Sequence, residues 1–483
     1  MATTTTTETL AGETGQPAKV QLAVIVVPLL LQGHLNQLLH LSHRISARGI
    51  PVHFAAPSTH NRQARARAHN PASSPDLIFH DLPMPEFENP SPNPNAANKF
   101  PAHMMPLMWA TTDLRQPVFQ LAEEVSSVAE KIVVIYDSLM AHVVQDILTI
   151  PNAKSYSLES ISAFALYSYF WETSAAGKPV FPAGVEVVGE VGPTEGSYPP
   201  ELLEFVGMVD SSPTFNSGEI LNTSREVEGF YVDLLAKEKL TGTGKIWAVG
   251  PFYPVVEIFE RNNKSSGCHS SRDKSLEWLD KQGRSSVVFV SFGTTSSLPE
   301  EQIFEIARGL ERSECKFLWV LRDADKGDVF AGDDVRRAPL PQGFEERVKG
   351  RGLIVRDWAP QLEILGHPSV GGFMSHCGWN SCMESMSLGV PIIAWPMHSD
   401  QPRNAILLTN LLKIGIQITD WEHCHKIVKS GAVEKAVKIL MASEEGDEVR
   451  KRADRLGIAV RESLKEGGAT AMEMDSFIED IKK

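Results

Sequence analysis

The chain has 483 residues, of which 42% are hydrophobic and 22% are charged, as in a globular protein of two or three domains at roughly 150 residues each. Its formal net charge of −14 argues against a nucleic-acid partner, because such proteins gather lysine and arginine on one surface. The five cysteines fit neither a disulfide framework nor a common zinc spacing, so we expect a reducing compartment and no bound metal.

The N-terminal residues 1–18 are rich in threonine and are predicted to form a disordered tail. The apolar run Leu22–Leu31 is too short to cross a bilayer of ~30 Å, and no small-residue cleavage site follows it. We therefore interpret Val20–Val27 as a buried strand and expect a cytoplasmic protein without a membrane segment.

A parallel sheet is predicted in the first half of the chain. After the first strand, the pattern predicts a helix over Leu35–Arg48 and strands over Val52–Ala56 and Ile132–Tyr136. Continuous β-branched runs separated by helices indicate a parallel sheet with helices on both faces. Such a sheet binds its ligands at the carboxyl ends of the strands.

The same alternation begins again in the second half. Its predicted strands are Ser286–Gly293, Lys316–Arg322, Leu353–Arg356, Val370–Ser375 and Pro391–Pro396. Its predicted helices are Glu300–Arg312, Gln361–Leu365, Asn380–Leu388 and Pro402–Leu412. The fold class is therefore α/β, with two doubly wound domains that face each other across a cleft.

The domain boundaries follow from composition. Residues 257–272 are rich in Asn, Ser and Gly and are predicted to link the two domains. We expect one domain at 19–256 and a second at 273–465. In the last segment, 466–483, a helix over Thr470–Ile481 is expected to pack back on the first domain.

The walls of an acceptor pocket are expected in the first half, in the irregular stretches Pro83–Pro106 and Gly177–Pro200, because loops on a rigid sheet carry specificity. A third irregular stretch, Asp323–Pro341, is polar. Aromatic residues can line such a pocket or belong to the core, and both interpretations stay open. The candidates are Trp109, Phe164, Tyr169, Phe170 and Trp171.

Two polar residues lie at strand ends of the predicted first sheet. His34 follows the first strand, and an imidazole with a pKa of ~6.5 can act as a base near neutral pH. Asp137 directly follows the strand Ile132–Tyr136, so it can orient and charge-stabilise that imidazole, as the acid does in a Ser-His-Asp triad. The competing residues lie inside predicted helices: His40, His43 and Asp146.

The stretch from residue 358 to residue 401 contains a strand–turn–helix junction. His376 follows a strand, Gly378 permits a tight turn, and Asn380 and Ser381 are preferred N-cap residues. The start of such a helix offers backbone N–H groups and a positive dipole end to a phosphate. His376 can donate to the same pyrophosphate, although a capping or core histidine is the alternative.

The other polar residues of this stretch suit a nucleotide sugar. Trp358 can stack on uracil or simply pack, and Gln361 can both donate and accept, as a uracil edge requires. The Glu384 carboxylate can bind two ribose hydroxyls or close a capping box. Asp400 and Gln401 suit paired sugar hydroxyls or an ordinary helix start.

In order, the motifs W-x-P-Q, H-x-G-W-N-S, E-S, G-V-P and D-Q of this stretch resemble the signature box of the plant UDP-dependent glycosyltransferases. QGHLNQ and ADKGDVFAG are similar to the zeatin O-glucosyltransferase subgroup, and this likeness extends over nearly the whole chain. The resemblance implies a GT-B fold of two Rossmann-like domains. It supports His34 and Asp137 as the catalytic pair. It implies a donor site made of Thr294, Trp358, Ala359, Gln361, His376, Trp379, Asn380, Ser381, Glu384, Asp400 and Gln401.

The chain departs from the family pattern at a few positions. Gln37 stands where members usually carry proline, Cys382 and Met383 where many carry Thr-Leu, and His398 where an aromatic or small residue is usual. None of these removes a polar group from the donor site. Gln401, rather than His, resembles members that prefer UDP-glucose.

The expected function is inverting transfer of glucose from the co-substrate UDP-glucose to a hydroxyl of a small molecule, by a monomer with no metal and no tightly bound cofactor. The resemblance suggests a zeatin-type cytokinin as acceptor. The alternatives are a flavonoid, other phenolic or terpenoid acceptor, UDP-xylose as donor, or a catalytically silent nucleotide-sugar-binding protein. A dinucleotide-dependent oxidoreductase would carry G-x-G-x-x-G after the first strand. The sequence there has a single glycine, which argues against this class of enzyme.

Overall fold

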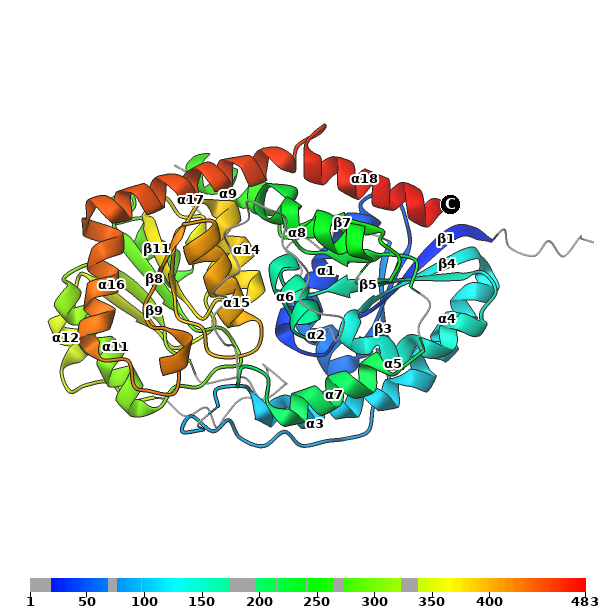
Figure 1. The fold of residues 1–483 in the computed structure, drawn as a ribbon, viewed down its shortest axis with the longest axis horizontal. Coiled ribbons are helices and arrows are strands. Elements are labelled where there is room, and N and C mark those ends of the chain that lie inside the picture. The colour runs from blue at the N-terminus through cyan, green and yellow to red at the C-terminus, as the bar shows by residue number, and fades with distance from the viewer. Residues whose placement is uncertain are drawn as a thin grey trace, which may run out of the picture.

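The computed structural model describes residues 19–67, 76–96, 98–173, 196–213, 216–239, 242–264, 273–322 and 338–483. The predicted tail 1–18 and most of the predicted loop at 177–200 lie outside the described residues. So do residues 265–272 of the predicted linker and residues 323–337. The described chain forms two α/β lobes side by side, each around its own sheet (Figure 1).

The first lobe contains a seven-stranded parallel sheet in the order β3-β2-β1-β4-β5-β6-β7. Its central strands are continuous β-branched runs, which suit a sheet that is buried on both faces. The register places Val24 of β1 opposite Val52 on one side and Val133 on the other. The strands are β1 (Val20–Val27), β2 (Val52–Pro57), β3 (Leu77–Leu82), β4 (Ala129–Asp137), β5 (Ala153–Glu159), β6 (Glu219–Leu221) and β7 (Ile246–Ala248).

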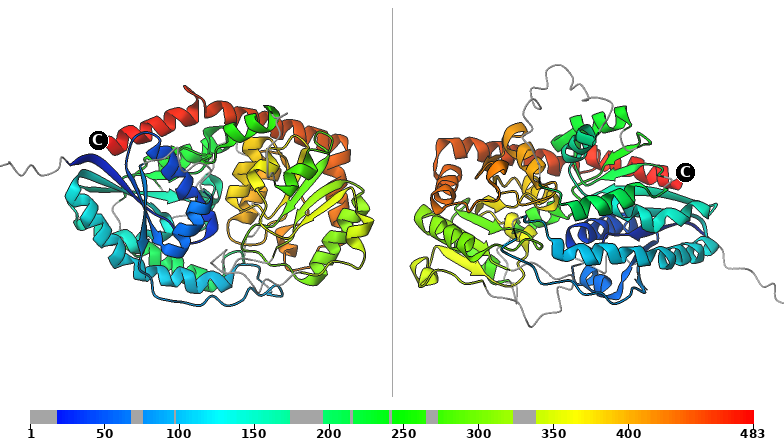
Figure 2. Two further views of the ribbon diagram at one scale, coloured as in Figure 1. Left: turned by 180° about the vertical axis from the view of Figure 1, so that it is seen from behind. Right: turned by 60° about the horizontal axis from the view of Figure 1, so that its bottom comes forward.

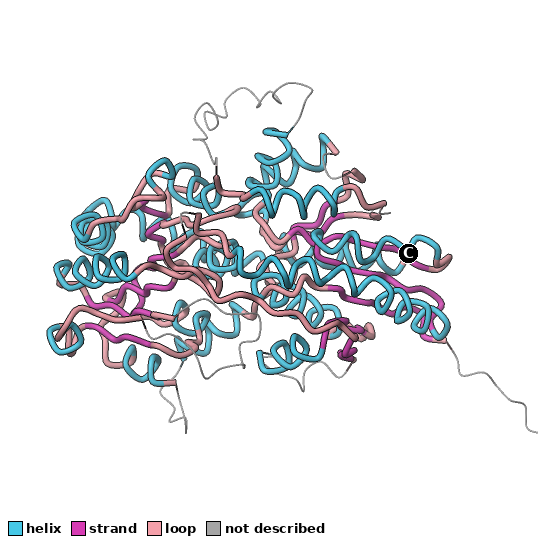
Figure 3. Tube along the Cα trace, turned by 90° about the horizontal axis from the view of Figure 1, so that it is seen from below, coloured by secondary structure: helices cyan, strands magenta, loops and turns pink. Residues whose placement is uncertain are grey.

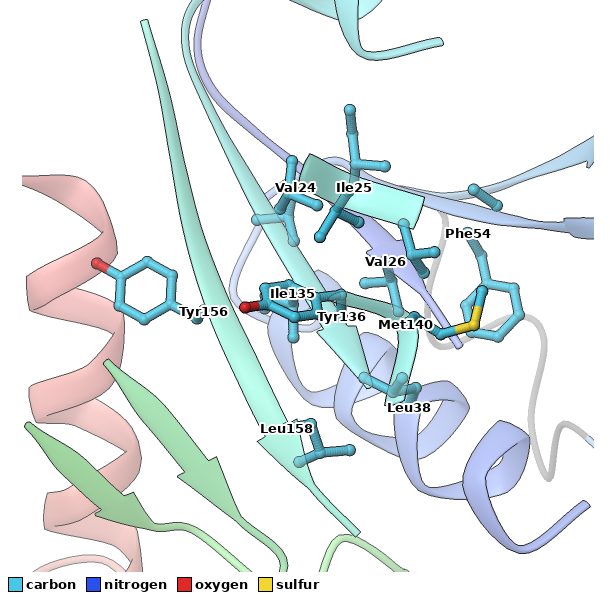
Figure 4. Close-up of a cluster of buried hydrophobic side chains, with 14 of the residues drawn as sticks. Val24, Ile25, Val26, Leu38, Phe54, Ile135, Tyr136, Met140, Tyr156 and Leu158 are labelled. Atoms are coloured by element: carbon cyan, nitrogen blue, oxygen red, sulfur yellow. The ribbon is translucent and has the colours of Figure 1, made fainter. Parts of the chain in front are cut away.

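Helices of the first half of the chain bury apolar side chains against this sheet, except the last of them, α9, which packs against helices of the second lobe. Figure 4 shows part of that core, where Leu38 of the first helix lies near Val26, Ile135 and Met140. The helices are α1 (Gln32–Ser46), α2 (Ser58–Arg67), α3 (Met105–Ala110), α4 (Arg115–Val128), α5 (Ala141–Val144), α6 (Ala163–Thr173), α7 (Pro200–Asp210), α8 (Arg225–Glu238) and α9 (Val255–Lys264). Short 3₁₀ turns are η2 (Ala102–Met104), η3 (Thr111–Leu114), η4 (Ser138–Met140) and η5 (Gln145–Thr149).

The second lobe repeats the design with a six-stranded parallel sheet in the order β10-β9-β8-β11-β12-β13. The strands are β8 (Val287–Ser291), β9 (Lys316–Val320), β10 (Gly352–Val355), β11 (Val370–Ser375), β12 (Ile392–Ala394) and β13 (Gly415–Gln417). The helices are α10 (Lys274–Leu279), α11 (Glu300–Ser313), α12 (Phe344–Arg347), α13 (Gln361–Leu365), α14 (Trp379–Leu388), α15 (Gln401–Ile406), α16 (Ser430–Ala442) and α17 (Glu444–Ser463). Two short turns are η6 (Leu407–Leu411) and η7 (Trp421–His423).

The C-terminal helix α18 (Ala469–Lys482) lies on the first lobe, at the end of the long helical path that α17 begins on the second (Figures 1 and 2). The Phe477 ring lies 5.5 Å from the rings of Tyr156 and Trp247, centroid to centroid. The Tyr156 hydroxyl donates to Asp480 at 2.8 Å, and Figure 4 shows this side chain pointing toward the helix. The last helix therefore belongs to the core of the first lobe.

The α/β class and the GT-B arrangement are confirmed by the two parallel sheets, which Figure 3 shows as separate groups of strands. Strands β1 and β11 have the predicted bounds. Helix α1 begins at Gln32, three residues before the predicted start at Leu35, because the extended residue Leu31 is its N-cap. The helix predicted over Pro402–Leu412 is α15 followed by a π-helical turn.

The predicted linker at 257–272 begins with helix α9 and not with irregular chain. The apolar residues of α9 have the spacing of one helix face, since Val255 and Ile258 are both buried and lie three residues apart. The position of the domain boundary itself stays a prediction. Within the described residues, no helix combines the length and the apolar character needed to cross a membrane.

Candidate active site

A cavity of about 1400 Å³ lies between the two sheets and is lined by residues of both lobes. Strands β1, β4, β5, β8 and β11 are each followed within a few residues by side chains that line it. This is the place where parallel sheets bind ligands. Sites for one small molecule usually measure ~300–1000 Å³, so this cavity has room for two ligands together.

His34 and Asp137 meet on the first-lobe side of the cavity. Nδ1 of His34 lies 2.7 Å from Oδ2 of Asp137. His34 lies in the first turn of α1, and Asp137 is the last residue of the neighbouring strand β4. The His34 side chain is 22% exposed, whereas Asp137 is fully buried, so only the imidazole is open to a ligand.

The contact with Asp137 fixes the chemistry of the imidazole. An ionised carboxylate can only accept, so the proton of a neutral His34 resides on Nδ1 and its Nε2 is left as the basic nitrogen. Burial lowers the pKa of His34, but the negative charges of Asp137 and Asp400 outweigh burial, and the net pKa is raised. His34 is therefore a stronger base than an ordinary histidine.

Asp137 is itself held in place by further donors. The Ser160 hydroxyl donates to its Oδ2 at 2.7 Å, and the backbone N–H of Leu139 donates to its Oδ1 at 3.1 Å. Ser160 directly follows strand β5, so the carboxyl ends of three adjacent strands, β1, β4 and β5, supply this group. A fully hydrogen-bonded buried carboxylate is a rigid support for the imidazole.

The junction of β11 and α14 forms the facing wall. The N-cap of α14 is Gly378, so the predicted N-caps Asn380 and Ser381 lie inside the first turn, and no side chain caps this helix. The early start follows from the extended conformation of Gly378 (φ −59°, ψ 141°). Asn380 instead donates from Nδ2 to the Gly33 carbonyl oxygen at 2.6 Å and ties the junction to the residue before His34. An uncapped helix start offers free backbone N–H groups and a positive dipole end, both of which favour an anion.

His376 lies packed between two glycines beside this helix start. A Cβ on Gly293 or on Gly378 would come within 2.7 Å or 2.5 Å of its Nε2. Burial lowers the pKa of His376 to about 4, so the imidazole is neutral near pH 7. Its Nδ1 has no hydrogen-bond partner among the described residues. A neutral imidazole with a free ring nitrogen can donate one N–H to a ligand oxygen.

Gln361 and Glu384 lie together on the same wall. Gln361 Nε2 donates to Glu384 Oε2 at 2.7 Å and to Ser381 Oγ at 3.0 Å. Burial raises the pKa of Glu384 to about 7, against the lowering effect of this hydrogen bond. Because the N-cap of α14 is Gly378, the third helical position is Ser381, and Glu384 cannot close the capping box that was the alternative. Trp358 is 56% exposed at the cavity edge, which leaves a ring face open for stacking.

The remaining predicted donor residues also line the cavity: Thr294, Ala359, Trp379, Asp400 and Gln401. Asp400 accepts from Asn404 Nδ2 at 2.7 Å, and burial raises its pKa to about 6. The amide oxygen of Gln401 accepts a hydrogen bond from the backbone N–H of Met397 at 2.9 Å. The Trp379 indole N–H donates to the Asn222 carbonyl of the first lobe at 2.9 Å.

The predicted acceptor residues divide into two groups. Tyr169 and Phe170 line the cavity. Phe164, Trp109 and Trp171 are not among the residues that line it. Phe164 is fully buried beside Tyr231, and Trp109 packs edge-on against Phe205, so the core interpretation holds for both.

Sequence reasoning did not assign Gln37, Glu159 or Ser160 to the site, although each lines the cavity, and it noted Gln37 only as a departure from the family pattern. Strand β5 is AKSYSLE, which mixes polar and apolar residues, so no continuous apolar run marked it. With β5 recognised, the strand-end rule would have pointed to the last two. Burial raises the pKa of Glu159 to about 7.

Among the described residues, no three His, Cys, Asp or Glu side chains gather in a way that can hold a metal ion. The α14 helix start, with its positive dipole end, and the neutral His376 imidazole can each offer N–H groups to a ligand oxygen in this cavity.

Comparisons with known proteins agree with this architecture. Residues 20–254 match the family model described as "Glycosyltransferase, N-terminal domain", and residues 249–446 match "UDP-glucoronosyl and UDP-glucosyl transferase". A transferase from Siraitia grosvenorii, solved in complex with UDP, aligns over 96% of this chain and 100% of its own, with a TM-score of 0.74 and 26% identity. Two facing Rossmann-like domains with this intervening cavity define a GT-B glycosyltransferase.

Curated relatives extend the likeness along the whole chain. Zeatin O-glucosyltransferase of Phaseolus lunatus is 50% identical over 97% of this chain and 98% of its own length. Zeatin O-xylosyltransferase of Phaseolus vulgaris is 46% identical over 96% of this chain and 99% of its own. The chain belongs to the UDP-glucuronosyl and UDP-glucosyl transferase family, and it is a transferase that uses a UDP-sugar.

Proposed function

We propose that this protein is an inverting glucosyltransferase that moves glucose from UDP-glucose to the side-chain hydroxyl of a zeatin-type cytokinin. The observation that carries the proposal is the position of the His34–Asp137 pair in the same cavity as the α14 helix start. The choice of acceptor rests on relatives named for zeatin, which are similar over nearly the whole chain.

In the proposed reaction, His34 Nε2 removes the proton of the acceptor hydroxyl, and Asp137 stabilises the imidazolium that forms. The acceptor oxygen forms a bond to the anomeric carbon from the face opposite UDP. The bond from that carbon to the phosphate oxygen breaks, and UDP leaves with the electron pair. One displacement inverts the anomeric carbon, so an α-linked donor yields a β-glucoside.

The donor is held by the second lobe. We assign the uracil to Trp358, Ala359 and Gln361, and the ribose hydroxyls to Glu384. The diphosphate fits the uncapped start of α14, where backbone N–H groups and the helix dipole stabilise the leaving group. His376 and Thr294 flank the same position. Asp400, Gln401 and Trp379 are assigned to the sugar.

The His34→Ala variant tests the proposal. It removes the base, so kcat falls about 10²–10⁴-fold, while UDP binding, measured by calorimetry, stays within a few-fold of the native protein. His53→Ala is the matched control, because His53 is a half-buried histidine of β2 that does not line the cavity. Undiminished turnover by His34→Ala would remove the base from the mechanism.

UDP-xylose is the second candidate donor, since one close relative is named a xylosyltransferase. Parallel assays with UDP-glucose and UDP-xylose on trans-zeatin, cis-zeatin, dihydrozeatin and flavonols decide both donor and acceptor. A protein that binds UDP-glucose yet forms no product with any of them would be the silent binding protein.

A monomeric state and a cytoplasmic location are part of the proposal. The described cysteines Cys315, Cys377, Cys382 and Cys424 are all free, which suits a reducing compartment. Size-exclusion chromatography with light scattering, and localisation of a fluorescent fusion, test the two statements.

A further inference from the structure

Part of the cavity lies against one face of the first sheet, at strands β4 and β5. Residues at alternate positions along this part of the chain line it: Tyr136, Ser138, Ser157 and Glu159. Tyr156 and Leu158, on either side of Ser157, are fully buried and do not line the cavity. Successive side chains of a strand point to opposite faces of a sheet, so the Glu159 side chain points to the face that the cavity occupies.

The Glu159 carboxyl can be reached from the cavity. Glu159 is the last residue of β5, which lies inside the sheet between β4 and β6. The residue is half-buried and therefore keeps accessible surface, unlike its neighbours Leu158 and Ser160. Neighbouring strands and the covering helices shield an internal strand, so this surface opens at the carboxyl end of β5, where the cavity lies.

The surroundings of Glu159 favour a neutral carboxyl. Burial raises its pKa to about 7, against the lowering effect of a hydrogen bond from the Ser138 hydroxyl. Three negative charges raise it further, those of Asp137, Glu219 and Asp210. Among the described residues, no lysine or arginine forms an ion pair with this carboxyl. A buried carboxyl without a cationic partner takes up a proton more readily than an exposed one.

A carboxylic acid presents a donor and an acceptor side by side, because its O–H donates while its carbonyl oxygen accepts. The complementary partner offers an N–H next to an unprotonated ring nitrogen. Helix α7 contacts the turn η4, which contains Ser138, and its residues Leu202, Val206 and Val209 line the cavity. Apolar walls beside a polar carboxyl favour a flat ring with one polar edge.

We propose that Glu159 is a specificity-determining residue whose carboxyl pairs with an N–H and the adjacent ring nitrogen of the acceptor while the acceptor hydroxyl lies at His34. This inference rests on the proposed function and adds the chemical class that the site selects, which is an amino-substituted nitrogen heterocycle with a hydroxyl on a short chain. One small molecule can reach both groups, because Leu158 pairs with Asp137 across strands that lie ~4.8 Å apart.

A purely structural role for Glu159 is the alternative, since its neighbour Ser160 donates to Asp137. That role predicts that removal of the carboxyl lowers activity equally for every acceptor. The proposed role predicts a loss confined to acceptors that carry the ring nitrogen, because a site built to pair a polar edge rejects analogues that lack it. Two matched acceptors therefore separate the two roles.

The experiment measures kcat/KM of the native protein and of Glu159→Leu with trans-zeatin and with its analogue in which naphthalene replaces the purine. The analogue keeps the exocyclic N–H and the side-chain alcohol but has no ring nitrogen. The native protein is expected to prefer zeatin by at least about 100-fold. Glu159→Leu should lose most of that preference through a lower rate with zeatin. Its rate with the analogue and its KM for UDP-glucose should stay within about threefold.

Two further variants complete the comparison. Glu159→Gln keeps a donor and an acceptor side by side, so it should retain the preference for zeatin. Glu130→Leu removes an exposed carboxylate of β4 outside the cavity and should change the rate with neither acceptor. Thermal unfolding midpoints verify that each variant folds.

Equal losses on both acceptors in Glu159→Leu, or no loss on either, would overturn the role of Glu159. A Glu159→Gln variant that loses the preference as fully as Glu159→Leu would overturn the pairing with a neutral carboxyl. An active native protein with no preference between the two acceptors would also overturn the proposal and leave glucosyl transfer intact. A native protein that glucosylates neither compound would contradict the proposed zeatin activity itself.

Discussion

The proposed catalytic base, His34, has its basicity set by two neighbouring carboxylates. Asp137, at 2.7 Å, and Asp400 raise the pKa of His34 against the lowering effect of burial. The base works only when it is neutral, so activity rises as the pH rises through the pKa of His34. The acidic limb of the kcat/KM profile is therefore expected above pH 6.5.

Asp137→Asn should lower kcat by about 10²–10⁴-fold, because the amide neither stabilises the imidazolium nor enforces the tautomer. Removal of the negative charge also lowers the pKa of His34, so the acidic limb of the profile should move to lower pH. Asp146→Asn is the control, because Asp146 pairs with Arg115 on the surface and lies outside the cavity. An unshifted limb in Asp137→Asn would show that another group controls it.

The positions of single site residues were predictable from sequence where the residue directly follows a clearly apolar strand. His34 and Asp137 follow apolar β-branched strands, and the structure brings their side chains together. Ser160 and Gln37 were not predictable, because one follows a mixed strand and the other lies in a helix like any polar residue. Pocket and core both stayed open for Phe164, because the sequence shows its aromatic character but not which side of α6 is buried.

At the scale of elements, the ends of β8 and β11 together shape the proposed diphosphate site. Gly293 follows β8 with a φ of +78°, and its missing Cβ leaves room for the His376 imidazole that follows β11. Strands β8 and β11 are parallel neighbours in the sheet, so the loops that follow them lie side by side. The position of His376 thus depends on a glycine distant in sequence.

Gly293→Ala should raise the KM for UDP-glucose about 10–100-fold, because the new Cβ would lie 2.7 Å from Nε2 of His376 and displace the ring. Gly49→Ala is the matched control. Its φ of +73° imposes a similar backbone strain, yet its Cβ meets nothing within 4 Å. Calorimetric titration with UDP measures the effect on binding, and equal affinities in both variants would refute the packing argument.

The boundaries of strands and helices were predictable where an apolar run changes sharply to polar residues or proline. The run VQLAVIVV gives β1 its bounds, since polar residues or proline flank an apolar stretch. The start of α14 was misplaced by one residue because Asn380 and Ser381 are good N-caps by type, whereas the hydrogen bond from Asn380 to Gly33 is a contact between lobes. Local propensity carries no information about such long-range contacts.

At the scale of the molecule, the two lobes are joined by direct contacts across the cavity. Asn380 bonds the Gly33 carbonyl, and Trp379 bonds the Asn222 carbonyl. Ser162 donates to Asn404 at 2.8 Å. Helix α18 adds a further connection, because it continues from the second lobe into the core of the first. The α/β class and the two-lobe plan followed from the repeated strand–helix pattern, whereas these contacts did not.

Phe477→Ala should lower the free energy of unfolding by about 3–5 kcal/mol, because a fully buried ring between Tyr156 and Trp247 is lost. Met472→Ala on the same helix is 59% exposed and should change it by less than about 0.5 kcal/mol. Urea unfolding followed by tryptophan fluorescence provides the measurement. Equal stability of the two variants would mean that α18 does not anchor the first lobe.

The most direct test of the account is the structure of the product that the native protein forms from UDP-glucose and trans-zeatin. Mass spectrometry identifies the conjugate, and the proton coupling at the anomeric carbon identifies its configuration by NMR. The account predicts a β-glucoside on the side-chain oxygen, with one UDP released per conjugate, and none from His34→Ala. An α-linked product, or a conjugate formed equally well without His34, would contradict direct displacement by a hydroxyl activated at this imidazole.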